Sequence, residues 1–229
     1  MRKWSTVDAV PTDDGVLELR HDGSTFIITI AGRVLMSSTA RRSEEALATL
    51  GCATVRRQPA PRVLIGGLGM AWTLRAALDT LPPAASVTVA ELTPTVLEWC
   101  RGPLAPVTNG AVHDPRASVV LGDVAKVIAD SPPHAWDAIL LDLYEGPHAA
   151  TQRRDDPFYG RAALSRSHRA LAPGGTFAVW AEDPDPGFPD RMKQAGFTVS
   201  THRVSNGGRT HIVYEGVAKG RRQMSNVTP

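Results

Sequence analysis

Three glycines, Gly66, Gly67 and Gly69, stand where an apolar run passes into a helix-forming run, in the segment RVLIGGLGMAWTLRAAL (62–78). Glycine adopts positive φ readily and lets a ligand approach the backbone closely. The first N–H groups of the following helix have no partner inside the helix and can bind a polar ligand. The segment therefore predicts a strand, turn and helix that wrap a nucleotide, with a tight turn that binds nothing as the alternative.

The residues around these glycines narrow the choice of nucleotide. A phosphate-binding loop would close on Gly-Lys-Ser/Thr, and this turn does not. The dinucleotide fingerprint G-x-G-x-x-G/A needs a small last residue, because helix and strand pack closely there. Counted from Gly67, that position holds Trp72. An adenosyl sulfonium such as S-adenosylmethionine carries no pyrophosphate, so its turn does not need the third small residue, and the sequence favours this ligand.

Two acids follow the next two predicted strands. Glu91, with Leu92 beside it, ends the run SVTVAE. It lies about 20 residues past the glycines, where a carboxylate can accept hydrogen bonds from ribose hydroxyls. Asp123 follows ASVVLG, where it could accept from the adenine amino group while the N–H of Val124 meets a ring nitrogen. The plainer interpretations are an acid at a strand end for Glu91 and a helix N-cap for Asp123.

Asp142 ends the fourth predicted strand, in DAILLDLYEGP. Open α/β sheets bind ligands outside the carboxyl ends of their strands. We therefore expect Asp142 in the same crevice as the glycines, in contact with the cofactor and available as a base. Asp137 lies at the other end of the strand, roughly 16 Å away at the rise of a strand, and is expected to cap the opposite edge of the sheet.

The long connection LYEGPHAATQRRDDPFY (143–159) follows and is a candidate lid over an acceptor. Tyr144 could take a proton from the acceptor, and Glu145 and Tyr159 could contact it. A lone loop histidine such as His148 is more often exposed to solvent.

The fifth predicted strand leads into VWAEDPDPGF, which brings Trp180 and Glu182 to the same rim. If Asp142, Glu145 and Glu182 converge, they form an anionic pocket suited to a cationic amine. Such clustering would raise the pKa of some of these carboxyl groups, which suits a general base. The neighbouring Asp183 and Asp185 are expected instead to cap the next helix.

The elements that must position these residues follow from the apolar pattern. Three β-type runs in residues 16–36 are separated by the turn signals HDGS and AG and predict an antiparallel meander. A helix over 43–50, capped by Ser43, follows. From Arg62 strands and helices alternate, as in a parallel sheet covered on both faces, and the last two runs flank SNGG as an antiparallel hairpin. The expected strands are 62–66, 86–92, 117–123, 136–144, 176–182, 197–204 and 209–217, and the expected helices include 72–81, one opened by Pro94, 124–130, 158–171 and 189–196.

These elements define an α/β chain with a methyltransferase-type, Rossmann-like parallel sheet, an antiparallel C-terminal hairpin and a small N-terminal β-meander. We expect residues 1–57 to form the meander and a connecting helix, 58–217 the adenosyl-binding catalytic domain, and 218–229 a disordered tail.

Composition limits the class of protein further. The chain has 229 residues, 42% of them hydrophobic and 21% charged, and a net charge of +2. No apolar run reaches the length of about 20 residues that a bilayer span needs. The N-terminal residues do not have the pattern of a secretion signal, and the small net charge does not favour binding to nucleic acid. Cys52 and Cys100 have neither disulfide-framework nor metal-ligand spacing, and His202 and His211 make no metal cluster that sequence can establish. We expect a cytoplasmic protein that holds no metal and binds neither nucleic acid nor membranes.

Several stretches of the chain resemble the spermidine synthase family: VLIGGLGMAWTLRAAL, VTVAELTPTVLEWCRGPL, DPRASVVLGDVAKVI, WDAILLDLYEGP and FYGRAALSRSHRALAPGG. The resemblance implies a methyltransferase-like fold whose N-terminal β-domain mediates a homodimer. It also implies that the glycine turn holds the adenosyl group, Glu91 the ribose and Asp123 the adenine. Asp142 and Glu145 keep two carboxylates at the spacing of the family's Asp-x-x-Asp, whose first acid helps to position and deprotonate the attacking amine; the resemblance gives that role to Asp142 and makes Glu145 a second catalytic candidate.

Two departures from the family concern the group transferred. The family's turn carries an acid that holds the cationic aminopropyl end of decarboxylated S-adenosylmethionine, whereas GGLGM carries none. Such an acid would repel the carboxylate of the intact cofactor. The segment MSSTARRSEEALATL (36–50) also lacks the family's tyrosine and histidine. We therefore expect a methyltransferase that uses S-adenosylmethionine and acts on a small, amine-bearing molecule. Aminopropyl transfer from the decarboxylated cofactor and a non-catalytic adenosyl-binding relative are the alternatives.

Overall fold

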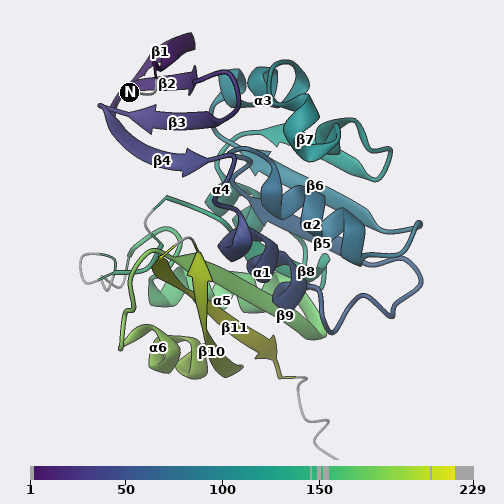
Figure 1. Ribbon diagram of the computed structural model, residues 1–229. Helices are drawn as coiled ribbons and strands as arrows, with labels where there is room; N and C mark the ends of the chain where they lie inside the picture. The colour runs from purple at the N-terminus through teal and green to yellow at the C-terminus, as the bar shows by residue number, and fades with distance from the viewer. Residues whose placement is uncertain (1–2, 145, 149–150, 152–154, 207, 220–229) are drawn as a thin grey trace, which may run out of the picture.

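The computed structural model describes residues 3–144, 146–148, 151, 155–206 and 208–219. It contains two sheets, a small one near the N-terminus and a large one that holds the rest of the strands (Figure 1). No helix in these residues is long and apolar enough to span a bilayer.

The small sheet is antiparallel, in the order β1-β2-β3-β4. Its strands are β1 (Ser5–Thr12), β2 (Gly15–His21), β3 (Phe26–Ile30) and β4 (Arg33–Ser37). The predicted meander is confirmed, but the prediction missed β1. That strand lies mostly exposed on the edge of the sheet, so its residues carry no alternation of apolar and polar types to mark it.

The large sheet has the order β10-β11-β9-β8-β5-β6-β7. The strands β5 to β9 pair in parallel, and β10 and β11 form an antiparallel hairpin against β9, as predicted. The chain order reverses between β5 and β8, which is the switch point where open α/β sheets bind ligands. The strands are β5 (Arg62–Gly66), β6 (Ser86–Glu91), β7 (Ala117–Leu121), β8 (Trp136–Leu141), β9 (Leu171–Ala181), β10 (Phe197–Asn206) and β11 (Arg209–Ala218).

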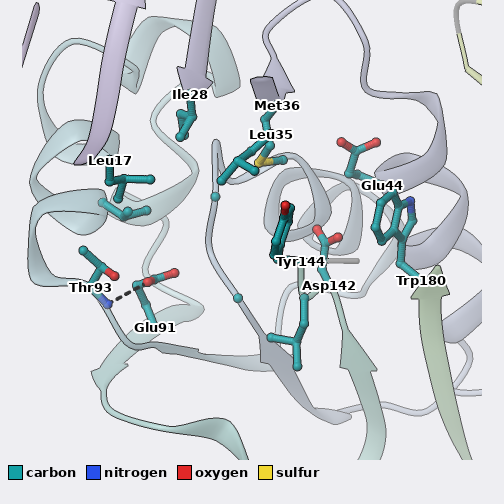
Figure 2. A pocket seen from close by; sticks show the side chains of 14 residues that line it. Leu17, Ile28, Leu35, Met36, Glu44, Glu91, Thr93, Asp142, Tyr144 and Trp180 are labelled. Carbon is teal, nitrogen blue, oxygen red and sulfur yellow. Dashed lines mark hydrogen bonds between the residues drawn. The ribbon is translucent and has the colours of Figure 1, made fainter. Parts of the chain in front are cut away.

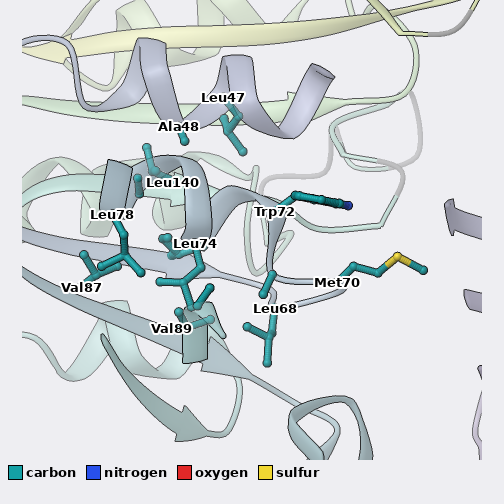
Figure 3. Close-up of a cluster of buried hydrophobic side chains, with 14 of the residues drawn as sticks. Leu47, Ala48, Leu68, Met70, Trp72, Leu74, Leu78, Val87, Val89 and Leu140 are labelled. Atoms are coloured by element: carbon teal, nitrogen blue, oxygen red, sulfur yellow. The ribbon is translucent and has the colours of Figure 1, made fainter. Parts of the chain in front are cut away.

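Helices cover both faces of the large sheet, and two buried apolar clusters mark the faces. Side chains alternate along a strand, so Leu140 of β8 packs on the face with α1 and α2 (Figure 3), whereas Ile139 and Leu141 pack on the face with α4 and α5. The helices are α1 (Arg42–Gly51), α2 (Trp72–Thr80), α3 (Pro94–Arg101), α4 (Val124–Asp130), α5 (Arg161–Ala170) and α6 (Phe188–Gln194), with 3₁₀ turns at Ala105–Thr108 and Ala111–His113.

Two local predictions were wrong. Ser43 does not cap α1: the helix begins at Arg42, and the Ser43 hydroxyl donates to the Glu44 carboxylate at 2.6 Å. The strand predicted from residue 176 begins at Leu171 instead. Its first residues, including Gly174 at φ +79°, pass through an irregularity in the pairing with β8, so the APGG turn signal lies inside the strand.

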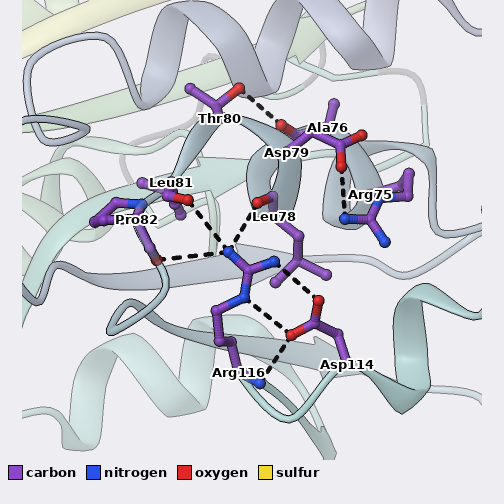
Figure 4. Close-up of polar contacts among 9 residues, drawn as sticks. All are labelled: Arg75, Ala76, Leu78, Asp79, Thr80, Leu81, Pro82, Asp114 and Arg116. Atoms are coloured by element: carbon purple, nitrogen blue, oxygen red, sulfur yellow. Dashed lines mark hydrogen bonds and ion pairs between the residues drawn. The ribbon is translucent and has the colours of Figure 1, made fainter.

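The amino ends of the parallel strands are held by polar contacts distant from the switch point. Arg116, before β7, donates to the carbonyl oxygens of Leu78 and Leu81 at the end of α2, and to the carboxylate of Asp114 (Figure 4). The guanidinium lowers the pKa of Asp114 to about 2. At the start of β8, Asp137 accepts from the backbone N–H of Arg62 at 2.8 Å, which agrees with its predicted role at this edge.

Candidate functional site

The glycine turn follows β5 and is shaped by close contacts. Gly67 has φ +89°, and a Cβ there would collide with the carbonyl oxygen of Asp142. Gly69 has φ +50°, and a Cβ there would meet the thioether of Met36 on β4. Gly66 packs without space for a side chain against Val124 and Leu141. These positions need glycine for positive φ or close packing, so the turn is built as the sequence predicted.

The two acids after β6 and β8 lie on one face of the sheet. Val87 and Val89 share the apolar cluster that α2 covers, and the two-residue period places Glu91 on the same side. The same period carries Asp142 to the side of Leu140. There the Thr73 hydroxyl, on α2, donates to the Asp142 carboxylate at 2.6 Å.

Glu91 is tied to the backbone of the turn. Its carboxylate accepts from the N–H of Leu68 and from the N–H of Thr93, both at 2.8 Å. The side chain is buried, with a residue exposure of 8%. The remaining acceptor sites of its two oxygens can take hydroxyl donors from a ligand in the cavity that it lines.

A cavity of about 250 Å³ lies beneath the small sheet and outside the carboxyl ends of β5, β6 and β8. Figure 2 shows Glu91 and Thr93 at one end, Glu44, Asp142 and Trp180 at the other, and Leu17, Ile28, Leu35 and Met36 along its roof. No Lys, Arg or His stands among the described residues that line it. The lining residues are Leu17, Ile28, Leu35, Met36, Glu44, Gly67, Gly69, Glu91, Thr93, Val96, Asp142, Leu143, Tyr144 and Trp180.

At the other end of the cavity, the carboxyl groups of Asp142 and Glu44 are both buried and repel each other when ionised. Burial and the negative charge of Glu44 raise the pKa of Asp142 to about 7, against a smaller lowering by the Thr73 hydrogen bond. Burial likewise raises the pKa of Glu44. The pKa of Asp142 is thus raised, the direction predicted for clustered carboxylates, but the neighbouring acid is Glu44 and not the predicted Glu182.

The remaining predicted cofactor residues lie beyond the cavity. Asp123 is exposed and caps α4 by accepting from the N–H of Ala125 at 2.7 Å, which is its plainer interpretation. Val124 is buried behind Gly66, and Leu92 is 72% exposed. None of these three lines the cavity, so the adenine contacts inferred for Asp123 and Val124 stay a prediction.

The predicted acceptor residues are placed in different surroundings. Tyr144 lines the cavity with its ring against the Arg33 guanidinium, 5.1 Å from the ring centroid. Trp180 lines it as well. Tyr159 is buried and packs edge-on against Phe188, outside the cavity. Burial and the charges of Asp156 and then Asp142 raise the pKa of its hydroxyl.

Glu182 does not converge with Asp142 in the cavity lining. Its two carboxylate oxygens pair with Arg33 of β4 and Arg209 of β11, each at 2.8 Å. Glu145, the other acid expected there, lies outside the described residues. Of the three acids expected to converge, Asp142 alone is seen in the lining.

Other polar residues near this rim have structural partners. Asp185 accepts from the N–H of Gly187, just before α6, and pairs with Arg191. No side chain caps α6, so the predicted capping by Asp183 and Asp185 is wrong. His202 contacts Glu215, and His211 stacks beside Trp180. Within the described part of the chain, no group of three or more His, Cys, Asp or Glu residues could hold a metal ion.

Sequence reasoning missed Glu44. A usable signal was present, because Glu44 shares a helical face with Leu47, Ala48 and Gly51. A carboxylate on the apolar face of a helix is unusual. Gly51 leaves no room for a side chain beside Leu140, so α1 lies close on the sheet and brings Glu44 into the cavity.

The geometry defines an open α/β fold with an acidic cavity at its switch point, and comparisons with known proteins agree with this class. No family model matches the chain. The solved spermidine synthase from Thermotoga maritima superposes with a TM-score of 0.76 and 20% identity, over 94% of this chain and 73% of that one. A spermidine synthase in complex with the transition state analogue AdoDATO gives a TM-score of 0.75 at 19% identity, over 94% and 72% of the two chains.

Among curated sequences, a polyamine aminopropyltransferase of Korarchaeum cryptofilum is 30% identical over 121 residues, 53% of this chain and 35% of that protein. Putrescine N-methyltransferase 2 of Nicotiana tabacum is also 30% identical over 121 residues, 53% of this chain and 32% of that protein. The chain thus matches about a third of the length of these relatives. The predicted resemblance to the spermidine synthase family is confirmed, by partial matches in sequence and by the fold.

Proposed function

We propose that the protein is a transferase that moves an alkyl group from an adenosyl sulfonium to a small amine, with S-adenosylmethionine as donor and methyl as the group. The observation that carries this proposal is the meeting of three carboxylates, Glu44, Glu91 and Asp142, in one cavity at the switch point. Such a lining favours ligands that carry positive charge, as a sulfonium and an ammonium both do.

Glu91 would hold the sugar of the donor. Its carboxylate is fixed by two backbone N–H groups, that of Leu68 in the turn and that of Thr93 before α3. It is therefore preorganised to accept hydroxyl donors at no further cost in side-chain freedom. The adenosyl group would then lie along Gly67 and Gly69, which the lack of side chains leaves accessible.

Asp142 would act on the acceptor. An ammonium must lose a proton before its nitrogen can attack, and a carboxylate with a pKa of about 7 is a stronger base than an ordinary aspartate. The nitrogen then forms a bond to the methyl carbon while the carbon–sulfur bond breaks and its electron pair stays on sulfur. The proton passes to Asp142 and then to solvent. The rest of the catalysis is in-line positioning.

Aminopropyl transfer from decarboxylated S-adenosylmethionine is the second candidate. In the family that this chain resembles, an acid in the glycine turn binds the aminopropyl group. The turn of this chain has no such acid, which favours the methyl donor. However, α1 supplies a different acid, Glu44, to the same cavity, and this favours a donor without a carboxylate. The names of the relatives include both activities.

Calorimetry with the two cofactors, followed by turnover with putrescine, separates the candidates. We expect S-adenosylmethionine to bind more tightly and to yield a methylated amine detected by mass spectrometry. Tighter binding of the decarboxylated cofactor with an aminopropylated product would replace methyl by aminopropyl transfer. Binding without turnover on a panel of amines would support the non-catalytic relative instead.

The assembly and location are part of the same proposal. The small sheet exposes Val7, Val16 and Val34, and a homodimer through this sheet would cover such apolar side chains. Gel filtration should then give twice the mass of the chain. We also propose that residues 58–217 form the catalytic domain and that the protein acts in the cytoplasm, which fractionation of cells would test.

A further inference from the structure

The packing of α1 places Glu44 in the cavity, but packing does not explain why this residue is an acid. It stands on the face of α1 that buries Leu47, Ala48 and Gly51, and it is 7% exposed. An apolar residue there would extend the buried face of the helix. Among the described residues, its carboxylate accepts from the Ser43 hydroxyl at 2.6 Å and from its own backbone N–H, and no cationic side chain pairs with it. Burial of its charge is therefore poorly offset.

The charged and titratable groups around it make the burial more costly. Asp142 faces it from the end of β8, and Glu45 adds a further negative charge on α1. Asp142 also accepts from the Thr73 hydroxyl, and the Tyr159 hydroxyl is a further titratable group near it. Two carboxylates thus face one space at the end of the cavity opposite Glu91, and the described lining offers no cation to either.

We infer that Glu44 is a specificity-determining residue: with Asp142 it binds one primary ammonium nitrogen of the acceptor, so the site selects aliphatic amines over neutral molecules of the same shape. The inference rests on the proposed function, which supplies the acceptor. An ammonium has three donors and no acceptor, and it can therefore bridge two carboxylates that otherwise repel each other.

The binding step balances in charge and protons. Two neighbouring carboxylates that repel each other share one proton near neutral pH and titrate as a pair. When the ammonium enters, it replaces that proton, which leaves to solvent, and the pair becomes doubly ionised around the cation. Amine binding should therefore release up to about one proton near pH 6.5.

The test compares Glu44→Gln with Glu45→Gln, a matched control one residue away whose side chain pairs with Arg41 on the outer face. Glutamine keeps the size of Glu44 and an oxygen for the Ser43 hydroxyl, and circular dichroism checks that the variant folds. Putrescine, 1-aminobutane and 1,4-butanediol are titrated calorimetrically into each protein loaded with S-adenosylhomocysteine, in two buffers of different ionisation heat.

We expect Glu44→Gln to bind both amines roughly 10- to 100-fold more weakly, the loss for a hydrogen bond to a charged group. Binding of an amine to this variant should also release fewer protons. The acid limb of its pH–rate profile for the amine should move to lower pH, because the like charge of Glu44 is gone. Glu45→Gln removes only the weakest of the influences on Glu44, so it should stay close to the parent in all three measurements, and the diol should bind each protein equally poorly.

Different failures have different meanings. If the parent does not bind S-adenosylhomocysteine, the proposed function is wrong. If it binds S-adenosylhomocysteine but putrescine affinity and proton release are the same in Glu44→Gln and Glu45→Gln, the role of Glu44 alone is wrong. Absence of amine binding by the loaded parent, or equal affinity for diol and diamine, also overturns the inference.

Discussion

The carboxylates at the two ends of the cavity have different hydrogen-bond partners. At one end, the Glu91 carboxylate accepts hydrogen bonds from two backbone N–H groups, of Leu68 in the glycine turn and of Thr93 before α3, each at 2.8 Å. At the other, Asp142 and Glu44 face each other, with the hydroxyls of Thr73 and Ser43 as donors. Hydrogen bonds from backbone amides stabilise the ionised form of a carboxylate, so Glu91 keeps its negative charge. Hydroxyl partners beside a second acid leave a negative charge that a bound cation would stabilise. This is the difference that we propose between an end that holds a sugar and an end that reacts.

The largest expected effect separates the ends by mutation. Asp142→Asn should lower amine turnover on the order of 10²- to 10⁴-fold, because the base is lost, while S-adenosylhomocysteine affinity stays nearly unchanged. Glu91→Gln should do the reverse, with cofactor affinity lowered roughly tenfold or more and turnover retained at saturating cofactor. Calorimetry and steady-state kinetics measure both. Equal loss of cofactor affinity in the two variants would show that the ends do not act separately.

The second effect is the pH dependence of the reactive end. Because the pKa of Asp142 is raised to about 7, its carboxylate is protonated at lower pH and can neither attract an ammonium nor accept its proton. We expect kcat/KM for the amine to fall about tenfold per pH unit below pH 7, while S-adenosylhomocysteine affinity stays flat between pH 6 and 8. A limb near the ordinary pKa of an aspartate would remove Asp142 from this role.

The third effect concerns the turn that joins the two ends. Gly67 has φ +89°, and in Gly67→Ala the new Cβ would also collide with the backbone carbonyl of Asp142. The substitution should therefore lower the free energy of unfolding by about 2–4 kcal/mol. In Gly69→Ala the Cβ meets the flexible side chain of Met36, so the loss should be smaller. Denaturant unfolding of both variants measures this, and an equal loss would mean that Met36 is as rigid as the backbone.

The smallest effect is on stability with pH. The folded-state pKa of Asp142 lies above its unfolded value of 3.8, so the stability it contributes is fully present below pH 4 and is lost as pH rises through about 7. Asp142→Asn should lose this dependence and be more stable than the parent at pH 8 by about 1–3 kcal/mol. Thermal unfolding across pH 5–8 compares them, and parallel curves for the two proteins would count against the raised pKa.

The parts of the site that could be predicted are those that local pattern determines. Glu91 and Asp142 end apolar runs, and the two-residue period of strands sends both to one face of the sheet. The hairpin of β10 and β11 was readable for the same reason, since a short turn joins two β-type runs.

The parts that could not be predicted depend on packing between distant segments. Glu182 meets Arg33, 149 residues away in the chain, and so its carboxylate is neutralised at the rim instead of joining Asp142. Glu44 enters the cavity only because α1 packs closely through Gly51. The strand β1 joins the structure through pairing with β2 and through Trp99, whose indole N–H donates to Asp8 at 2.8 Å, contacts that no local pattern reveals.

The lining of the cavity runs from Leu17 to Trp180 along the chain. During synthesis on the ribosome, the roof from the small sheet and the turn after β5 emerge long before the strand that carries Trp180. The binding site is therefore completed only when most of the polypeptide has left the exit tunnel. A cofactor can then stabilise the finished protein, but it cannot guide the earlier steps by which the nascent chain folds.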